Sequence, residues 1–418
     1  MSSKTVKYIS VYAACLLAAV AACIMLALPR AAAADAQGAP VTVVVVTERG
    51  EKFVYKDEYI VPSDFTVEEE IEQRKINAPL QEKIALVDMW MSNGADYSGA
   101  LNVCFPRLNG FVDGIASALF VEATDAAVKY SNGKFFVTDH KVGRVLDENK
   151  LYANIYCALK FTGGGTVRAD TVAVQPQVTK PELVQNLVKR SEYTTDYTTS
   201  SASRSHNVDI ALKKFDGIVV SPGQCLSFNG MVGERSEENG FKKAKIIVDG
   251  KYTEGVGGGV CQASTALYNA AILAGLHASA NAHSICPSYC PPGLDAMISG
   301  FSDLIIQNTT AHNIYISVST CGGRGTVAVF GEPNEYKIVP ESVILKTIEH
   351  DEVEITDTEH KYFDQTSSRG DRLLVSPGKD GVVSETYLKY YKNGEFIKRV
   401  KIRTNEYRAV PQVIAVAP

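Results

Sequence analysis

Apolar residues first gather in an uncharged run over residues 9–29, which follows Lys4 and Lys7. A bilayer crossing needs roughly 20 apolar residues, so this run is long enough to span a membrane. We expect a retained single-pass anchor in the cell membrane, with the bulk of the chain on the extracytoplasmic side. The alternative is a cleaved signal peptide and a secreted protein, because residues 31–34 are all alanine and offer a cleavage site.

Beyond this run, strand-like and helix-like patterns follow one another. The expected elements are strands at 41–46 and 52–59, an acidic helix that starts over 66–73, a hairpin at 126–137, a helix at 148–159 and a strand ending at Val174. The hairpin is the sharpest of these predictions, because Asn132-Gly133 is a turn sequence that tight hairpins prefer. From residue 336 the chain is richer in strands, with alternation over residues 386–391 and 397–402. The fold class predicted is therefore α+β, multidomain, with an all-β C-terminal module.

Length and charge limit the class of protein. A chain of 418 residues has room for two or three domains that each bury a core. The net charge is −5, only 21% of the residues are charged and no basic stripe occurs, which argues against a nucleic-acid partner. No cofactor and no metal are expected. A zinc site made of Cys261, His283, Cys286 and Cys290 is a minor alternative, because the spacing fits no common ligand pattern.

One segment carries the strongest chemical signal. Gly257, Gly258 and Gly259 come directly before Val260 and Cys261, and an apolar helical run follows. Cys261 is thereby expected at or near a helix N-terminus, where unpaired N–H groups and the helix dipole favour an anion. Such positions lower the pKa of a cysteine from about 8.5 into a range of roughly 3.5–7.5. The segment lacks the Gly-Lys-Ser/Thr ending of a phosphate-binding loop, so we exclude nucleotide binding of that kind.

Chain geometry supplies a partner for this thiol. A helix over residues 262–275 rises about 21 Å, and an extended return over residues 277–283 covers about 23 Å. The return ends at His283, beside Cys261, which predicts a Cys/His pair of the kind that nucleophilic catalysis uses. The alternative is that Cys261 is a small buried apolar residue and that His283 is a histidine satisfied by ordinary hydrogen bonds.

The cysteine count does not decide which cysteines form disulfides. Nine cysteines occur, and two of them, Cys15 and Cys23, lie in the apolar run, so an odd number remains. Complete pairing would leave one thiol over, and we choose Cys261 as that thiol. A disulfide between Cys104 and Cys157 is one pairing among several that the sequence allows.

Separated motifs in the middle of the chain resemble the VanW domain. In chain order they are Arg204 with Asn207, Ser221-Pro222-Gly223, Ser227-Phe228-Asn229, Val232-Gly233-Glu234-Arg235, Gly257-Gly258-Gly259-Val260-Cys261-Gln262, Ser264-Thr265, Leu267-Tyr268-Asn269, His283-Ser284, Tyr289, Pro292-Gly293, Asp295-Ala296, Asp303 and Asn308. The resemblance implies a bacterial cell-envelope protein, and the family's reaction is not established. The chain departs from the family pattern at Ser279-Ala280-Asn281, where a Glu-Arg pair is usual, and at Cys225 and Cys290, where apolar residues are more common.

The flanking regions carry resemblances of their own. The region before the VanW-like motifs is similar to a peptidoglycan-binding domain, and the region after them resembles a five-glycine (G5) domain without its terminal glycine. The expected domains are an anchor or signal segment at 1–40, a peptidoglycan-binding-like domain at 41–190, a VanW domain at 191–335 and a five-glycine-like domain at 336–418. These resemblances imply peptidoglycan or its peptides as the partner, and the N-terminal helix implies contact with the membrane. The alternative is that either flanking region is only a spacer.

These predictions combine into a hypothesis for the site. Cys261 attacks a carbonyl, His283 takes and returns the proton, and Asp295 or Asp303 orients the imidazole. The expected substrate-binding residues are Gly257, Gly258, Gly259, Gln262, Ser264, Thr265, Arg235, Asn229, Tyr289 and Asn308. The reaction would be amide hydrolysis or acyl transfer on a wall peptide. The alternative is a noncatalytic wall-binding or scaffolding protein.

Overall fold

The computed structural model describes residues 40–57, 75–248, 251–364 and 367–418. The expected anchor at 9–29 and the acidic helix at 66–73 lie outside these residues. Within the described ranges, no helix is both long and apolar enough to cross a membrane. Contacts divide the chain into two units, which are described separately: one reaches to Asp125 and includes His140–Gln177, and the other comprises Ala126–Asp139 and Val178–Pro418.

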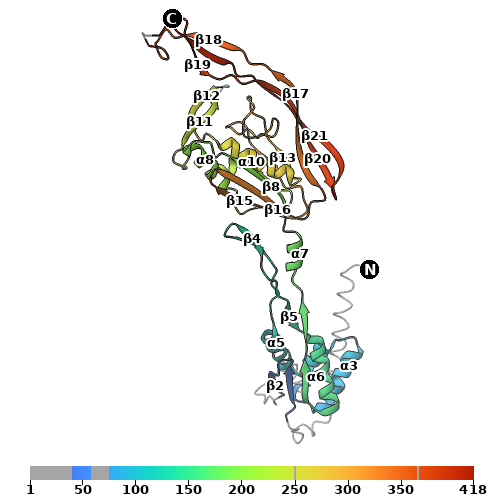
Figure 1. Ribbon diagram of the computed structural model, residues 1–418. Helices are drawn as coiled ribbons and strands as arrows, with labels where there is room; N and C mark the ends of the chain where they lie inside the picture. The colour runs from blue at the N-terminus through green and yellow to red at the C-terminus, as the bar shows by residue number, and fades with distance from the viewer. Residues whose placement is uncertain (1–39, 58–74, 249–250, 365–366) are drawn as a thin grey trace, which may run out of the picture. The chain divides into compact units, whose positions relative to one another are not determined.

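The first unit packs helices against a small sheet (Figure 1). The sheet has the order β2-β1-β6, with β2 antiparallel and β6 parallel to β1. Its elements are β1 (Thr42–Thr47), β2 (Lys52–Lys56), α3 (Leu80–Ser92), α4 (Tyr97–Cys104), α5 (Arg107–Leu119), β5 (Gly143–Leu146), α6 (Glu148–Thr162), β6 (Gly165–Ala169) and β7 (Thr171–Val174). Alternation along β1 sends Val43 and Val45 into the same core as Ile155 of α6.

Several local predictions for this unit are confirmed. β1, β2, α6 and β7 lie at the expected residues, and α6 begins where the Asp147 carboxylate accepts the Lys150 N–H at 3.1 Å. The sequence patterns missed α3, α4 and α5. Gly110 and Gly114 lie inside α5 and weaken its intrinsic helix preference, so packing of its apolar side stabilises it instead.

The second unit contains a central domain built on a four-stranded antiparallel sheet. The sheet order is β8-β16-β15-β9, formed by β8 (Val188–Asp196), β9 (Ile218–Val220), β15 (Ile314–Cys321) and β16 (Arg324–Gly331). Helices α8 (Ala202–Lys213) and α10 (Val260–Leu273) pack on it. Almost every residue of α10 is buried, including the polar Gln262, Ser264, Thr265 and Asn269, which makes it the central helix of this domain.

The predicted hairpin packs against this sheet rather than within the first unit. Its strands are β3 (Val128–Ser131) and β4 (Lys134–Val137), joined by Asn132 and Gly133 with φ of 51° and 74°. Phe135 contacts Tyr315 and Phe330, with ring centroids 5.2 and 6.1 Å away. These two residues pair across the sheet and alternate with Ile314, Ile316 and Val329 of the core, so the hairpin covers the sheet face opposite the helices.

Smaller elements complete the central domain. They are α7 (Lys180–Gln185), β10 (Cys225–Ser227), α9 (Phe228–Val232), β11 (Lys243–Val248), β12 (Lys251–Val256), β13 (His277–Ser279) and β14 (Ile305–Gln307). β10, β14 and β13 form one small sheet in that order, and β11 pairs with β12. β13 contacts α10, so the chain does return along the helix as the sequence predicts.

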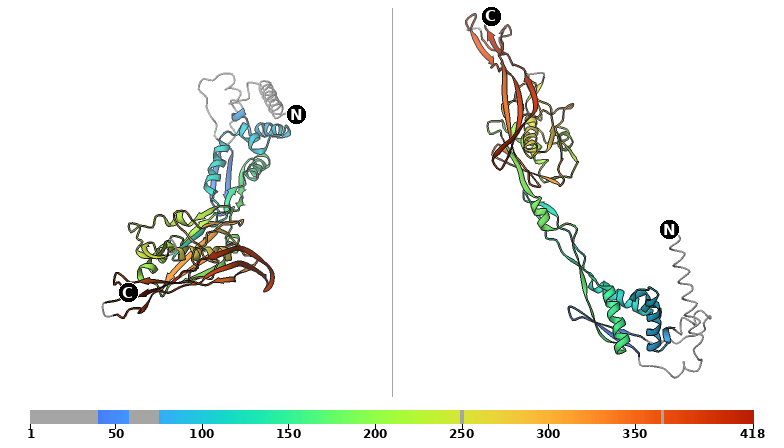
Figure 2. Two further views of the ribbon diagram at one scale, coloured as in Figure 1. Left: turned by 90° about the horizontal axis from the view of Figure 1, so that it is seen from above. Right: turned by 90° about the vertical axis from the view of Figure 1, so that its right-hand side faces the viewer.

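The C-terminal β module completes the second unit. Its long sheet has the order β17-β20-β21, made of β17 (Lys337–Ile348), β20 (Gly381–Lys392) and β21 (Glu395–Tyr407). Its distal sheet has the order β18-β22-β19, made of β18 (Glu352–Thr356), β19 (Arg372–Ser376) and β22 (Gln412–Val416). Both views of Figure 2 show these orange and red strands along the yellow region that carries α10. The predictions of α+β architecture and of an all-β C-terminal module are confirmed.

Asn207 of α8 ties the glycine segment before α10 to the rest of the central domain. Its side chain is fully buried, and its Nδ2 donates to the carbonyls of Lys242 at 2.8 Å and Gly258 at 2.9 Å. Its Oδ1 accepts the Lys242 N–H at 2.8 Å. One side chain therefore bonds three backbone groups, of which the Lys242 carbonyl also accepts the Gly257 N–H at 3.1 Å.

We expect Asn207→Ala to lower the free energy of unfolding of this unit by about 2–4 kcal/mol, because buried backbone groups lose their partners. Thermal and urea denaturation of the purified protein measure the loss. The control is Asn239→Ala, which removes one exposed bond to the Glu234 carbonyl and should cost less than about 0.5 kcal/mol. Equal losses in the two variants would contradict the role given to Asn207.

Candidate active site

Cys261 is the second residue of α10, and the glycines before it are required by the packing. Gly259 precedes the helix with φ of 104°, a conformation that residues with side chains rarely adopt. A Cβ on Gly258 would lie 2.6 Å from the Lys245 carbonyl oxygen of β11, so only glycine fits there. The glycine segment therefore allows the backbone to approach β11 closely and to begin α10 directly before the cysteine.

The backbone amide of Cys261 is unpaired among the described residues. The neighbouring N–H groups of Val260 and Gln262 donate to the carbonyls of Gly257 at 3.2 Å and Gly259 at 2.9 Å. Across the described ranges of the chain, no protein acceptor takes the N–H of Cys261. An N–H at a helix N-terminus carries partial positive charge and suits an anionic oxygen.

The Cys261 thiol lies between a histidine and a backbone carbonyl. It forms a hydrogen bond with the His283 ring, and its Sγ lies 3.5 Å from the Ile298 carbonyl oxygen. Burial raises the pKa of Cys261, but the hydrogen bond to His283, the charge of that ring and the nearby Arg235 together lower the pKa below its ordinary value. The arrangement favours a thiolate.

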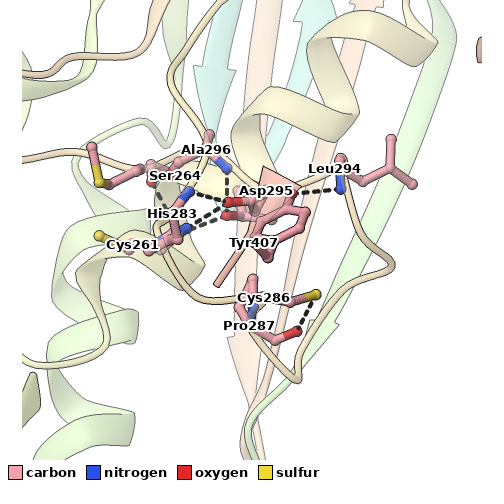
Figure 3. Close-up of polar contacts among 12 residues, drawn as sticks. Cys261, Ser264, His283, Cys286, Pro287, Leu294, Asp295, Ala296 and Tyr407 are labelled. Carbon is pink, nitrogen blue, oxygen red and sulfur yellow. Dashed lines mark hydrogen bonds and ion pairs between the residues drawn. The ribbon is translucent and has the colours of Figure 1, made fainter. Parts of the chain in front are cut away.

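His283 is held by a buried carboxylate on its other side (Figure 3). Its Nδ1 lies 2.6 Å from Asp295 Oδ2, and its backbone N–H donates to the same oxygen at 2.7 Å. Asp295 is ionised, because hydrogen bonds from His283 and Tyr407 lower its pKa despite burial, so Nδ1 is the donor and Nε2 faces the thiol. Burial lowers the pKa of His283, but the bonds to Asp295 and Cys261 outweigh it and raise the pKa to about 9.

Asp295 makes contacts that the sequence patterns did not reveal. The Tyr407 hydroxyl donates to its Oδ1 at 2.5 Å, and Arg403 Nη2 donates to its backbone carbonyl at 2.5 Å. Both residues belong to β21 of the C-terminal module, 112 and 108 positions away along the chain. No local signal in the sequence links them to the site.

Asp303, the other expected partner of the imidazole, is bonded elsewhere. Its Oδ1 accepts the N–H groups of Asn229 and Leu304, each at 2.8 Å, and its Oδ2 accepts the Ser227 hydroxyl at 2.5 Å. The carboxylate thereby caps α9. The structure places Asp295, and not Asp303, against His283.

Arg235, Asn229 and Tyr289 lie near the thiol. Arg235 Nη2 bonds to Asn229 Oδ1, while its buried Nε has no acceptor among the described residues. The Asn229 Nδ2 donates to the carbonyls of Ser299 at 3.0 Å and Ser302 at 2.9 Å. The Tyr289 ring lies edge-on to His283, with centroids 6.4 Å apart. Of the expected binding residues, these three share the surroundings of Cys261.

Four other expected binding residues are used inside the fold. Gln262, Ser264, Thr265 and Asn308 are all buried. Gln262 bonds to Thr195 and Asp196, Ser264 to the carbonyls of Cys261 and Ala296, Thr265 to the Cys261 carbonyl and the Ala296 N–H, and Asn308 to the carbonyls of Val220 and His312. Most of their polar atoms therefore bond within the fold, while Gln262 Oε1 is buried without a partner among the described residues.

Within the described residues, the other cysteines form neither a disulfide nor a metal site of the kinds considered. Cys157 is exposed and free while Cys104 is buried in the first core, so the disulfide between them is wrong. In the described part of the chain, no group of three or more His, Cys, Asp and Glu residues is placed to hold a metal ion. Cys286 and Cys290 are buried, which raises the pKa of both thiols.

A thiol at a helix N-terminus, a histidine beside it and a buried carboxylate behind the histidine form a cysteine–histidine–carboxylate site. The class of protein is therefore one that carries such a site. Three family models match in chain order: "Putative peptidoglycan binding domain" at residues 65–168, "VanW like protein" at 203–330 and "G5 domain" at 346–417. The chain belongs to the VanW family. The three domains together indicate a cell-wall-associated, extracytoplasmic protein.

Two sequence relatives support this assignment. The "Uncharacterized protein YoaR" of Bacillus subtilis (strain 168) is 30% identical over 236 residues, covering 56% of this chain and 77% of the relative. The "Vancomycin B-type resistance protein VanW" of Enterococcus faecalis (strain ATCC 700802 / V583) is 27% identical over 147 residues, covering 33% of this chain and 54% of the relative. Two solved G5 domains, from an IgA1 protease and from HP0197, each cover 20% of this chain at 15% and 13% identity, with TM-scores of 0.14 and 0.12.

The pKa directions predict how Cys261 reacts with iodoacetamide. Its lowered pKa puts thiolate below about pH 8.5, the ordinary value for a cysteine. In His283→Ala the burial remains without the compensating hydrogen bond, so the pKa rises to or above the ordinary value. We expect alkylation at pH 7 to be at least about tenfold faster in the wild type, since one pKa unit changes the thiolate fraction about tenfold.

Peptide mapping by mass spectrometry locates each modified cysteine over a series of pH values. The exposed Cys321 serves as an internal control that should be insensitive to His283→Ala. Wild-type Cys261 that reacts only after denaturation would contradict an activated thiol.

Proposed function

We propose that this cell-wall-associated protein carries out thiol chemistry on an amide bond of a peptidoglycan peptide. The observation that carries the proposal is the alignment of Cys261, His283 and Asp295, in which the Nδ1–Oδ2 distance of 2.6 Å fixes the imidazole with its other nitrogen toward the thiol. The family models contribute the substrate class, because a peptidoglycan-binding domain precedes the site in the same chain. The membrane anchor at residues 9–29 is part of this proposal.

The first step forms a thioester. The Cys261 thiolate attacks the amide carbonyl carbon, a C–S bond forms, and the carbonyl oxygen becomes an oxyanion. The N–H of Cys261, which has no acceptor among the described residues, would donate to this oxyanion. The imidazolium of His283 then gives its Nε2 proton to the leaving nitrogen, the C–N bond breaks and an amine departs.

The second step releases the acyl group. Neutral His283 takes a proton from a water molecule or an incoming amine, which attacks the thioester carbonyl. The C–S bond breaks, and Cys261 leaves as a thiolate beside the imidazolium. Water gives hydrolysis and a carboxylic acid, whereas an amine gives acyl transfer and a new amide.

The charge near the thiol supports a peptide that carries a carboxylate. Arg235 adds a positive charge, and its Nε is buried without an acceptor in the described residues. Asp303 places a negative charge near Arg235, but its oxygens accept from Ser227, Asn229 and Leu304. A ligand carboxylate would satisfy the Nε and offset the cost of leaving it unpaired. The same observation supports a second candidate, a noncatalytic wall-binding protein that holds the carboxylate through Arg235 and leaves every bond intact.

Substitution of the thiol separates these two candidates. We expect Cys261→Ala to abolish release of wall fragments and to leave binding to purified cell walls within about twofold, because the change removes a nucleophile and little contact area. Liquid chromatography with mass spectrometry of reduced, enzyme-treated cell walls measures the reaction, and co-sedimentation measures binding. Cys321→Ser is the matched control, since that thiol is exposed at the end of β15 and Cys261 lies on α10.

The outcome assigns one function. New wall fragments from the wild type and the Cys321→Ser variant, and none from Cys261→Ala, support the enzyme. An unchanged wall under reducing conditions, together with binding that Arg235→Gln weakens at least about tenfold, supports the binding protein instead.

A further inference from the structure

We propose that the C-terminal β module completes the thiol site, with Tyr407 and Arg403 as positioning residues for Asp295. The inference rests on the proposed function, because it concerns the same thiol. The family model that contains Cys261, His283 and Asp295 ends at residue 330, while the model that contains the two positioning residues begins at residue 346. The site is therefore shared between two domains of different families.

Tyr407 fixes the rotation of the Asp295 carboxylate. Its hydroxyl donates to Oδ1 at 2.5 Å and accepts the Gly293 N–H at 2.7 Å, while Oδ2 receives both donors of His283. Tyr407 is fully buried, and burial together with the charge of Asp295 raises its pKa far above the ordinary value. The phenol thus remains a donor at every pH at which the site would work.

Arg403 holds the backbone on both sides of the carboxylate. Its Nε donates to the Gly293 carbonyl and its Nη2 to the Asp295 carbonyl, each at 2.5 Å, and Nη2 lies 3.4 Å from Asp295 Oδ1. Its guanidinium carbon lies 5.1 Å from the Tyr268 ring centroid on α10. One side chain of β21 therefore joins the loop that carries Asp295 to the helix that carries Cys261.

Further bonds hold the same loop against the module. Ser342 of β17 donates to the Pro292 carbonyl at 2.7 Å, and the Arg408 N–H donates to the Ser284 carbonyl at 2.8 Å. A Cβ on Gly293 would lie 2.0 Å from Thr386 Oγ1 of β20, so the loop and the long sheet are in close contact. Figure 3 shows Tyr407 directly beside Asp295.

The geometry predicts a specific change in reactivity. Without the Tyr407 hydroxyl the carboxylate is free to rotate, the bond from His283 weakens, and the imidazolium loses part of its stabilisation. The thiolate that pairs with this imidazolium then forms at higher pH. A residue that only supported the fold would lower stability and leave this titration unchanged.

The experiment measures the pH profile of Cys261 alkylation in the full-length protein at a temperature well below its melting point. We expect Tyr407→Phe to raise the pH of half-maximal labelling by about 0.5–1 unit, which is the scale of one weakened charge-assisted hydrogen bond. Arg403→Gln should raise it similarly, and Arg403→Lys should restore part of the shift because a donor and a charge return.

Matched controls come from the same sheet. Tyr387→Phe removes a hydroxyl bonded to Glu385, and Arg399→Lys changes a cation bonded to Glu341, so neither touches Asp295. Both controls should keep the wild-type profile.

The proposed function and the positioning role of Tyr407 and Arg403 are contradicted by different results. If wild-type Cys261 labels only above about pH 8.5, the thiol is not activated and the proposed function fails. If the wild type labels at lower pH and Tyr407→Phe and Arg403→Gln keep that profile, whatever their melting temperatures, the thiol site stands and the positioning role is overturned.

Discussion

A buried negative charge at Asp295 is the constraint on which the rest of the site depends. Its side chain is completely buried, and an isolated carboxylate in such a place would be neutralised or would destabilise the fold. Donors from three directions prevent this: the His283 amide and ring, the Tyr407 hydroxyl, and the Arg403 guanidinium at 3.4 Å. Each donor fixes another part of the molecule, so the charge organises the histidine, its loop and the C-terminal strand together.

The thiol side of the site depends on backbone geometry rather than on charge. Gly258 allows the chain to approach β11, and Gly259 adopts the positive φ that begins α10, so Cys261 arrives at the helix N-terminus. Asn207 bonds to the Gly258 carbonyl and keeps this segment in place. The helix end and the buried carboxylate act on the pair from opposite sides: one favours the thiolate and the other favours the imidazolium.

The boundary between the two family models runs through the site, whose residues belong to both matches. The VanW match ends before the G5 match begins, yet residues of both contact Asp295. The C-terminal module is therefore connected to the thiol through Asp295 and His283, in addition to any contact that it makes outside the chain. In the same way, the hairpin at residues 126–139 belongs by contacts to the unit that contains the central domain.

Local sequence determined the features that depend on neighbouring residues. The Asn132-Gly133 turn, the apolar run of α10 and its glycine start all follow from conformational preferences within a few residues. Even the proximity of Cys261 and His283 followed from the length of α10 and of the extended segment that runs back along it. Only the tertiary structure decided between Asp295 and Asp303, because both follow His283 closely and differ only in where their loops fold. It alone brought Tyr407 and Arg403 to the site, since contacts across more than a hundred residues arise from packing and leave no periodic signal in the sequence.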